Sequence, residues 1–260
     1  MSEGRKKVGL ALGGGAARGI AHIGVLKALR DFQIPVDMVA GVSAGAVVGA
    51  FFAAGLDIET MEDKVSQVTW SDFATFHFSK IGMMSSKPIE SFIERYIGKM
   101  TFAELQKPFA TLATDLITGR GVILNSPKAL VSTAVRASAS FPGVLDPTEI
   151  DGRYLCDGGA VENVPISVVR GMGADVVIAV DVIPQVELSR PPAHMMAVVD
   201  RGLDILLNNR MKCIASNADI ILHPMTEYFA SRHFKHSKRM IELGVQSVIQ
   251  NIDLIKKAIA

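Results

Sequence analysis

The feature of this sequence that most constrains the fold is a serine held between two glycines, where a strand is expected to pass into a helix. The uncharged run 38–42 predicts a buried strand, and 44–54 predicts a buried helix. Between them Ser43 stands in a G-x-S-x-G pattern with Gly41 and Gly45. Such a sharp turn strains the serine and lifts its hydroxyl clear, and a Cβ at either glycine would clash. Because the new helix also directs its amide dipole at developing negative charge, Ser43 is a candidate nucleophile.

A second glycine-rich turn follows the apolar run Val8–Leu12, which predicts a strand leading to a helix over 20–29. Its residues are Gly13, Gly14, Gly15, Ala16, Ala17, Arg18 and Gly19. A dinucleotide-binding turn is disfavoured because Arg18 replaces the third glycine and no acidic residue ends the second strand. A Walker turn is disfavoured because no Gly-Lys-Ser/Thr follows. The bare amides suit an anion, which in a hydrolase is the oxyanion of the tetrahedral intermediate. For Arg18 we favour packing against the carbonyls of the loop over contact with a phosphate.

A carboxylate on a tight turn is the third candidate group. Asp157 precedes Gly158 and Gly159 and follows an expected strand over 153–156. Farther on, Asn163 and Pro165 are typical of a helix cap and a first helical turn. A carboxylate at a strand end is well placed to face the end of another strand, so Asp157 is a candidate base.

Two arrangements of the base remain open at this point. The chain has six histidines, so a triad of Ser43, Asp157 and, for example, His223 is one solution. In the other, the carboxylate takes the hydroxyl proton directly and returns it to the leaving alcohol. A free aspartate titrates at about 3.9 and is a weak base in water. A two-residue arrangement therefore requires a dry pocket.

The remaining apolar runs predict an α/β fold with three layers, α/β/α, around a mainly parallel central sheet. Strands are expected at 109–116, 120–124, 176–182 and 219–222, and helices at 127–139 and 241–259. Because no linker or repeat interrupts the pattern, we expect one domain over 1–260, with a motif core at about 8–181 and a C-terminal helical region at about 191–260.

Three segments bear on membrane contact. The uncharged stretch 38–56 has the length of a bilayer span, but its four glycines and flanking aspartates favour a buried strand and helix. The stripe of the last helix, which Lys256 and Lys257 flank, favours a helix packed on the sheet over a membrane-surface helix. The aromatic-rich segment 70–84 fits either ordinary core or a mobile cover over an apolar pocket.

Composition narrows the partners and the compartment. A net charge of +1 in 260 residues gives no reason to expect nucleic acid as a partner. Two cysteines, Cys156 and Cys213, are too few for a disulfide framework and match no zinc spacing. Residues 1–12 lack the core of a signal peptide. We therefore expect a cytoplasmic protein, with peripheral contact at the inner membrane surface left open.

Together the three motifs resemble the oxyanion loop, the nucleophile elbow and the Asp-Gly-Gly/Ala motif of patatin-like phospholipases, in matching order. Residues 136–142, which read RASASFP, are similar to the segment that this family carries before its Asp motif. The resemblance covers roughly residues 8–181 and points to the bacterial branch related to neuropathy target esterase.

The resemblance implies a Ser43–Asp157 dyad, an oxyanion hole of backbone amides at Gly14, Gly15 and Ala16, and no metal or cofactor. Its implied substrate is a lipid or other acyl ester. The family pattern has glycine where this chain has Ala16, and the added methyl group is expected to affect substrate size more than catalysis. A lipid- or protein-binding regulator without activity and a Ser-Asp-His hydrolase are the alternatives.

Overall fold

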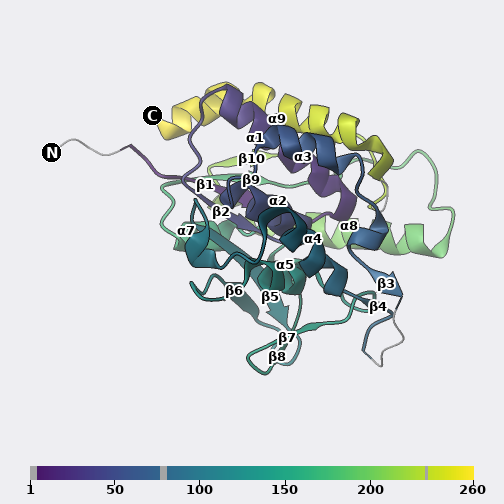
Figure 1. Ribbon diagram of the computed structural model, residues 1–260. Coiled ribbons are helices and arrows are strands. Elements are labelled where there is room, and N and C mark those ends of the chain that lie inside the picture. The colour runs from purple at the N-terminus through teal and green to yellow at the C-terminus, as the bar shows by residue number, and fades with distance from the viewer. Residues whose placement is uncertain (1–4, 77–80, 232–233) are drawn as a thin grey trace.

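A mixed β-sheet forms the centre of the computed structural model, which describes residues 5–76, 81–231 and 234–260 (Figure 1). Its strand order is β10-β9-β1-β2-β5-β8-β7, with β6 paired to β5. The strands are β1 Val8–Leu12, β2 Met38–Gly41, β5 Phe109–Asp115, β6 Gly121–Leu124, β7 Thr148–Ile150, β8 Arg153–Asp157, β9 Val176–Val180 and β10 Ile220–Leu222. The five strands from β10 to β5 are parallel, and the pairs β5–β6, β5–β8 and β7–β8 are antiparallel.

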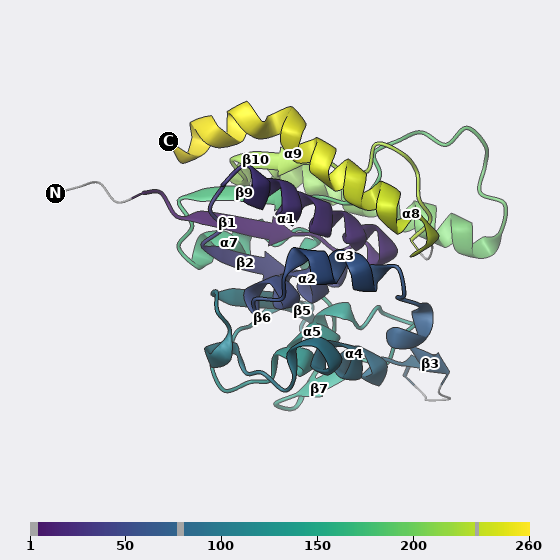
Figure 2. The same ribbon diagram turned by 45° about the horizontal axis from the view of Figure 1, so that its top comes forward.

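Helices cover both faces of this sheet (Figure 2). They are α1 Ala21–Asp31, α2 Ala44–Ala53, α3 Ile58–Val65, α4 Lys87–Ile97, α5 Val131–Ala139, α6 Gly159–Glu162, α7 Ile166–Gly171, α8 Met195–Ile214 and α9 Ser237–Ile259. Short 3-10 helices are η1 Ala16–Ile20, η2 Trp70–Asp72, η3 Phe102–Glu104, η4 Ala215–Asn217 and η5 Phe234–His236.

Alternate residues of the central strands divide the core in two, as the pleat requires. Leu10, Leu12 and Ile178 belong to the larger cluster, which contains α1, α2 and α9. Ala11 and Val177 belong to the cluster on the other face, which is completed by α7 and Met211 of α8. The expected fold class, an α/β/α sandwich around a mainly parallel sheet, is confirmed.

The C-terminal region contributes to the same sheet and core. Its strand β10 pairs with β9, and its last helix α9 packs along α1, where Ile241, Val248 and Ile255 are buried. The stripe of α9 therefore faces the protein, so the membrane-surface interpretation of this helix is wrong. Both the expected motif core and the C-terminal region supply strands to one sheet, and the single domain over 1–260 stays a prediction.

The C-terminal helix, expected over 241–259, begins earlier, at Ser237, and two other predicted helix starts also differ from the structure. The helix expected over 127–139 begins only at Val131, because Leu130 is extended and bridges to Thr101. The second difference concerns Asn163, which was expected to cap the helix containing Pro165. That helix, α7, begins at Ile166 and has no capping bond from Asn163.

The aromatic-rich segment 70–84 contains both packed and exposed side chains, and its residues 77–80 lie outside the described part of the chain. Phe73 stacks on Phe234 with ring centroids 5.8 Å apart and also contacts Phe92. Phe76 in the short hairpin of β3 Thr75–Phe76 and β4 Met84–Ser85 is 81% exposed. Part of the segment is thus core, and the hypothesis of a cover stays a prediction. Within the described residues, no helix combines the length and the apolar character needed to cross a bilayer.

Candidate active site

Ser43 occupies the turn between β2 and α2 in a strained backbone conformation, with φ 53° and ψ −121°. The glycines around it allow the turn to close. A Cβ on Gly41 would lie 2.3 Å from the carbonyl oxygen of Gly45, and a Cβ on Gly45 would lie 2.1 Å from that of Leu12. Non-glycine residues rarely adopt this conformation, and such strain is found where surrounding contacts impose it. The turn presents a half-buried Ser43 at the start of a helix.

The strand registers place Asp157 level with Ser43 on the other side of β5. Gly41 is paired with Thr111 in β5, and Asp157 is paired with Ala113 two residues farther along the same strand. Because Ser43 lies two residues beyond Gly41, both side chains leave the sheet at the same height. The Ser43 side chain lies near enough to the Asp157 carboxylate to lower its pKa.

Asp157 lies in a dry environment. Asp157 is 6% exposed, and this burial raises the pKa of its carboxyl to about 6. The Gly159 N–H and Ser43 lower the pKa, but by less than burial raises it. The Gly159 amide donates to Asp157 Oδ1 at 2.8 Å. The neighbouring Cys156 thiol has its pKa raised to about 11, first by burial and then by Asp157, so it stays protonated at neutral pH. A carboxylate with a pKa near 6 is a better base than a free aspartate and is still ionised at neutral pH.

The end of α5 contacts both halves of the site. Ser43 N–H donates to Ser138 Oγ at 3.0 Å, and the carbonyl of Ser138 accepts from Gly158 N at 3.3 Å. The carbonyl of Ser140 accepts from Asp157 N at 2.9 Å. One stretch of three residues therefore fixes the serine turn and the aspartate turn relative to each other. This gives a physical role to the RASASFP segment singled out in the sequence.

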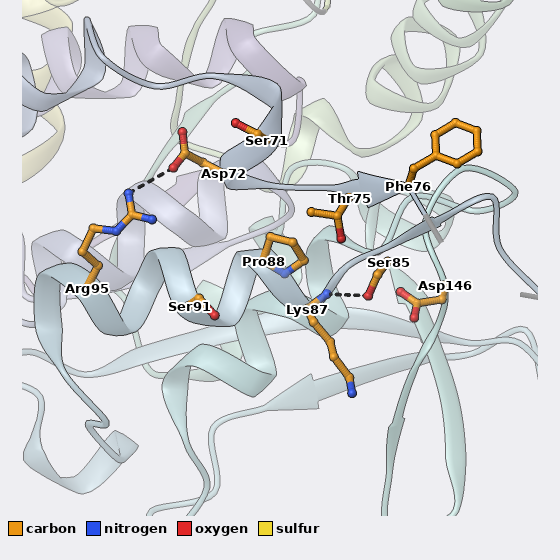
Figure 3. A pocket seen from close by; sticks show the side chains of 10 residues that line it. All are labelled: Ser71, Asp72, Thr75, Phe76, Ser85, Lys87, Pro88, Ser91, Arg95 and Asp146. Carbon is orange, nitrogen blue, oxygen red and sulfur yellow. Dashed lines mark hydrogen bonds and ion pairs between the residues drawn. The ribbon is translucent and has the colours of Figure 1, made fainter. Parts of the chain in front are cut away.

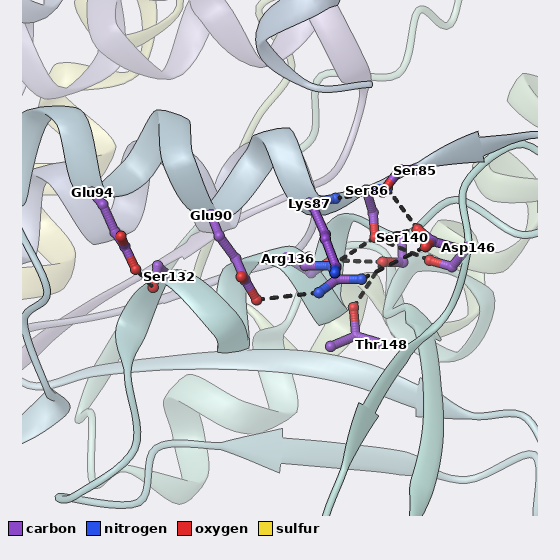
Figure 4. A network of polar contacts seen from close by, with 10 residues as sticks. All are labelled: Ser85, Ser86, Lys87, Glu90, Glu94, Ser132, Arg136, Ser140, Asp146 and Thr148. Atoms are coloured by element: carbon purple, nitrogen blue, oxygen red, sulfur yellow. Dashed lines mark hydrogen bonds and ion pairs between the residues drawn. The ribbon is translucent and has the colours of Figure 1, made fainter. Parts of the chain in front are cut away.

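A polar network around Arg136 holds that stretch in place (Figure 4). Arg136 Nε donates to Ser86 Oγ at 2.7 Å, and its guanidinium lies 3.4 Å from Glu90 and 3.8 Å from Asp146. Its backbone carbonyl accepts from Ser140 Oγ at 2.9 Å. The guanidinium is thus surrounded by acceptors at the N-terminus of α4, which ties α4 to the end of α5.

The loop after β1 passes directly beside Ser43. A Cβ on Gly14 would lie 3.1 Å from the Cβ of Ser43 and 2.7 Å from Asn163 Oδ1, so only glycine fits. Gly14 N–H donates to the backbone carbonyl of Asn163 at 3.0 Å, and Asn163 Nδ2 donates to the carbonyl of Gly14 at 3.1 Å. Asn163 therefore holds the loop and does not cap α7, which corrects the sequence-based interpretation.

These bonds occupy one of the three backbone N–H groups that were expected to form the oxyanion hole. The Gly14 N–H is already committed to Asn163, so its donation to an oxyanion is not favoured in this conformation. For the N–H groups of Gly15 and Ala16, by contrast, no protein acceptor is recorded among residues 5–76, 81–231 and 234–260. Ala16 has φ 51°, the left-handed conformation that glycine adopts at lower cost. The loop keeps its shape with alanine at a position where the family pattern has glycine.

Arg18 anchors the far end of this loop and is almost fully buried. Its Nε donates to the carbonyl of Phe229 at 2.9 Å, and its NH1 nitrogen lies 2.7 Å from Asp204 Oδ1 of α8. Burial raises the pKa of Asp204, and the charge of Arg18 opposes this effect. The structural role expected for Arg18 agrees with the structure, but its partners come from distant segments instead of the loop's own carbonyls.

The other glycines of the motifs serve packing and hydrogen bonding. Gly13 N–H donates to the carbonyl of Val180 at 3.0 Å, which joins the loop to β9. A Cβ on Gly19 would lie 2.5 Å from the Cβ of Ala44, so η1 packs closely on α2. A Cβ on Gly158 would lie 2.2 Å from the carbonyl oxygen of Leu112 in β5.

The histidines that the structure describes lie in other environments. His22 Nε2 is 2.8 Å from the carbonyl of Gly13, and burial lowers its pKa to about 4. His223 Nδ1 is 3.6 Å from Asp181 Oδ2, and His194 accepts from the first turn of α8. His236 packs on the ring of Phe229. His77 and His233 lie outside the described residues.

A groove of about 630 Å³ lies between the β3 hairpin and α4 (Figure 3). Its lining includes Asp72, Lys87, Arg95 and Asp146, and it does not include Ser43 or Asp157. Among the described residues we find no cluster of three or more metal-ligating side chains.

Two contacts around the site were missed by reasoning from the sequence. Asn163 was assigned to a cap because it precedes Pro165, and nothing local indicates its bonds to Gly14, 149 residues away. Asp204 carries no motif, and nothing in the residues around it indicates its pairing with Arg18, 186 residues away.

The comparisons with known proteins agree with this geometry. A family model described as patatin-like phospholipase matches residues 10–170, more than half of the chain. The chain belongs to this family. An uncharacterized NTE family protein of Mycobacterium tuberculosis is 37% identical over 176 residues, covering 67% of this chain and 48% of the relative. The neuropathy target esterase of Drosophila melanogaster is 38% identical over 186 residues, 67% of this chain and 13% of the relative.

A lysophospholipase of Aspergillus fumigatus is 33% identical over 183 residues, 68% of this chain and 12% of that protein. The chain thus spans about half the length of the mycobacterial relative and a small part of the eukaryotic ones. Two solved structures share the patatin fold. VipD from Legionella pneumophila has a TM-score of 0.55 at 13% identity, covering 98% of this chain and 67% of VipD. Human GIVD cytosolic phospholipase A2 has a TM-score of 0.51 at 11% identity, with coverage of 98% and 59%.

Proposed function

We propose that this patatin-like protein is a lipid acyl hydrolase in which Ser43 is the nucleophile and Asp157 is the base. The observation that carries the proposal is the position of the strained Ser43 level, across β5, with a buried carboxylate whose pKa is raised to about 6. Membership of a phospholipase family, and relatives named esterase and lysophospholipase, support an ester of a lipid as substrate.

In the first half of the proposed reaction, Ser43 Oγ attacks the carbonyl carbon of the ester while Asp157 accepts the hydroxyl proton. Negative charge forms on the former carbonyl oxygen as the tetrahedral intermediate appears. When the intermediate collapses, the bond to the alcohol breaks and Asp157 returns the proton to the leaving oxygen. The acyl group remains on Ser43 as an ester.

In the second half, a water molecule attacks the acyl-enzyme and Asp157 accepts a proton from it. Collapse releases the fatty acid, and the proton returns to Ser43 Oγ, which restores the starting state. One carboxyl group thus serves as base and acid in each half-reaction. Its raised pKa suits both directions of transfer.

For the oxyanion we infer stabilisation by the N–H groups of Gly15 and Ala16, together with the N-terminus of α2 behind Ser43. Asn163 and Arg18 are positioning residues in this scheme, since they fix the two ends of the loop.

A Ser-Asp-His hydrolase is disfavoured because none of the histidines described by the structure is recorded in contact with Asp157. A regulator without activity is disfavoured because both the proposed nucleophile and the proposed base are present, level with each other across β5.

The decisive experiment measures hydrolysis of para-nitrophenyl esters from short to long acyl chains and labelling by a fluorophosphonate. We expect turnover and labelling by the wild type, and neither by Ser43→Ala with an unchanged melting temperature. Asp157→Asn is expected to bind substrate but not to turn it over. A folded wild-type protein that neither labels nor hydrolyses any of the esters would support the regulator instead.

A further inference from the structure

Helix α8 buries Asp204 and Met211 on its inner face and leaves a row of apolar side chains on its outer face. Five apolar side chains recur at helical spacing along the outer face: Met195 is 76% exposed, Val198 56%, Val199 44%, Ile205 48% and Leu206 66%. We call these five residues the α8 stripe. An ordinary surface helix shows the reverse, with the apolar stripe facing the core. A contiguous exposed apolar face of this kind marks an interaction site.

The inner face explains why α8 cannot turn its stripe toward the core. Asp204 is paired with the buried Arg18, and Asp200 accepts a hydrogen bond from Ser231 Oγ at 3.0 Å. Ser231 in turn accepts from the N–H of Ala17 through its carbonyl, at 2.9 Å. The two aspartates lie one turn apart and hold α8 against the oxyanion loop. Rotating the stripe inward would break both contacts and leave Arg18 without its counter-charge.

The outer charges of α8 are all basic. Its two acidic residues, Asp200 and Asp204, are the pair on the inner face. Arg201 lies one turn before Ile205, and Arg210 lies one turn after Leu206, so they stand on the borders of the stripe. Lys212 is exposed near its end. An apolar strip bordered by Arg and Lys is the pattern of helices that lie in the headgroup region of a bilayer.

We propose that the α8 stripe docks this protein on an anionic lipid surface. The apolar side chains enter the headgroup–acyl boundary, and Arg201, Arg210 and Lys212 meet the phosphates. Figures 1 and 2 both show α8 at the end of the molecule opposite the N-terminus. A second copy of the chain fits this surface less well. A symmetric pairing of two stripes would bring the same basic borders together without an acidic partner.

The inference rests on the proposed function in one respect, since an acyl hydrolase of membrane lipids must meet its substrate at the bilayer surface. Through Asp204 and Arg18 the docked helix is attached directly to the loop beside Ser43. Docking therefore brings the lipid surface and the oxyanion loop into contact with the same helix.

The test separates docking from catalysis by using Ser43→Ala, which leaves the lipid intact. Flotation is measured with vesicles of phosphatidylcholine alone and with vesicles of equal parts phosphatidylcholine and phosphatidylglycerol. We expect binding to the anionic vesicles, and a fall of about tenfold or more in the partition coefficient when Leu206→Asp is added. Leu254→Asp is the matched control, because this leucine is 57% exposed on α9 and lies outside the stripe. It is expected to bind like the parent.

Charge is tested separately by Arg210→Glu, which is expected to weaken binding to anionic vesicles and to leave the melting temperature unchanged. Equal binding by Leu206→Asp and its parent would overturn the proposal. So would a parent that stays off both kinds of vesicle but forms a dimer that Leu206→Asp dissociates, since the stripe would then join two copies.

Catalysis is read in a separate assay with Ser43 present. Leu206→Asp is expected to hydrolyse a soluble short-chain ester at the wild-type rate. Its rate on vesicle phospholipid is expected to fall by about tenfold or more. Vesicle binding without any esterase activity would leave docking intact and refute the proposed function alone. Esterase activity without vesicle binding would leave the proposed function intact and refute docking alone.

Discussion

Replacing the proposed base should make the protein more stable at neutral pH while removing the proposed activity. Asp157 is 6% exposed, and burial raises its pKa from the ordinary 3.8 to about 6 in the folded protein. The charged carboxylate is therefore a cost to the folded state at neutral pH. A tenfold change in an acid constant corresponds to about 1.4 kcal/mol, so this cost is about 3 kcal/mol at most. In Asp157→Asn an uncharged amide keeps an oxygen for the Gly159 N–H and removes the charge.

The sign of the pH dependence follows from the raised pKa. Below the unfolded-state pKa the carboxyl is protonated in both states, and its contribution to stability is fully present. As pH rises through about 6 the folded state must ionise it, and that contribution is lost. The wild type should thus lose stability relative to Asp157→Asn as the pH rises from about 4 to 7. Near pH 4 the free energies of unfolding of the two proteins should be similar.

The assay is urea unfolding of both proteins across this pH range, with Ser43→Ala as a control that retains the carboxyl. We expect Asp157→Asn to gain about 1–3 kcal/mol over the wild type near pH 8 and little near pH 4. In parallel, kcat/KM of the wild type should rise with pH and level off above an apparent pKa of about 6. The reasoning would be refuted if Asp157→Asn were no more stable than the wild type at high pH. It would also be refuted if the difference in their free energies of unfolding did not change with pH.

Four other substitutions probe the supports of the site. Ser138→Ala leaves the Ser43 N–H without its acceptor and should lower kcat by about tenfold to a hundredfold at similar KM, measured by ester hydrolysis. Asn163→Leu removes the donor to Gly14 and should cost about 1–3 kcal/mol and slow fluorophosphonate labelling. Ala16→Gly relieves a left-handed alanine and should add about 1 kcal/mol in urea unfolding, with activity retained. Asp204→Ala leaves the buried Arg18 without its counter-charge and should lower the free energy of unfolding by about 3–5 kcal/mol, measured by urea unfolding. The double change Arg18→Met with Asp204→Leu should recover most of this loss.

The parts of the fold and site that follow from the sequence are those set by local contacts. The turn at Ser43 was predictable because its glycines, its strand and its helix lie within a few residues of one another. The strands β1, β2 and β9 were predictable because parallel strands covered on both faces are continuous apolar runs.

The parts that were not predictable depend on contacts between distant segments. Whether Asn163 caps a helix or holds Gly14 is decided by the approach of the loop after β1, which the residues around Asn163 do not encode. The same applies to Asp204, whose partner Arg18 is 186 residues away in the chain. An apolar stripe also does not reveal which way it faces. The stripe of α9 turned out to be core, and the one on α8 faces outward because two aspartates occupy its inner side.

The short stretch Ser138 to Ser140 has a consequence for how such a protein can diversify. Because it bonds to the turn after β2 and to the turn after β8, this stretch fixes the spacing of the proposed nucleophile and base together with the register of the strands between them. The turn between β5 and β6, where Ile117 is 76% exposed, makes none of these bonds. Insertions there can change what surrounds the dyad while its two members keep their separation, so new specificities need not be reached through inactive intermediates.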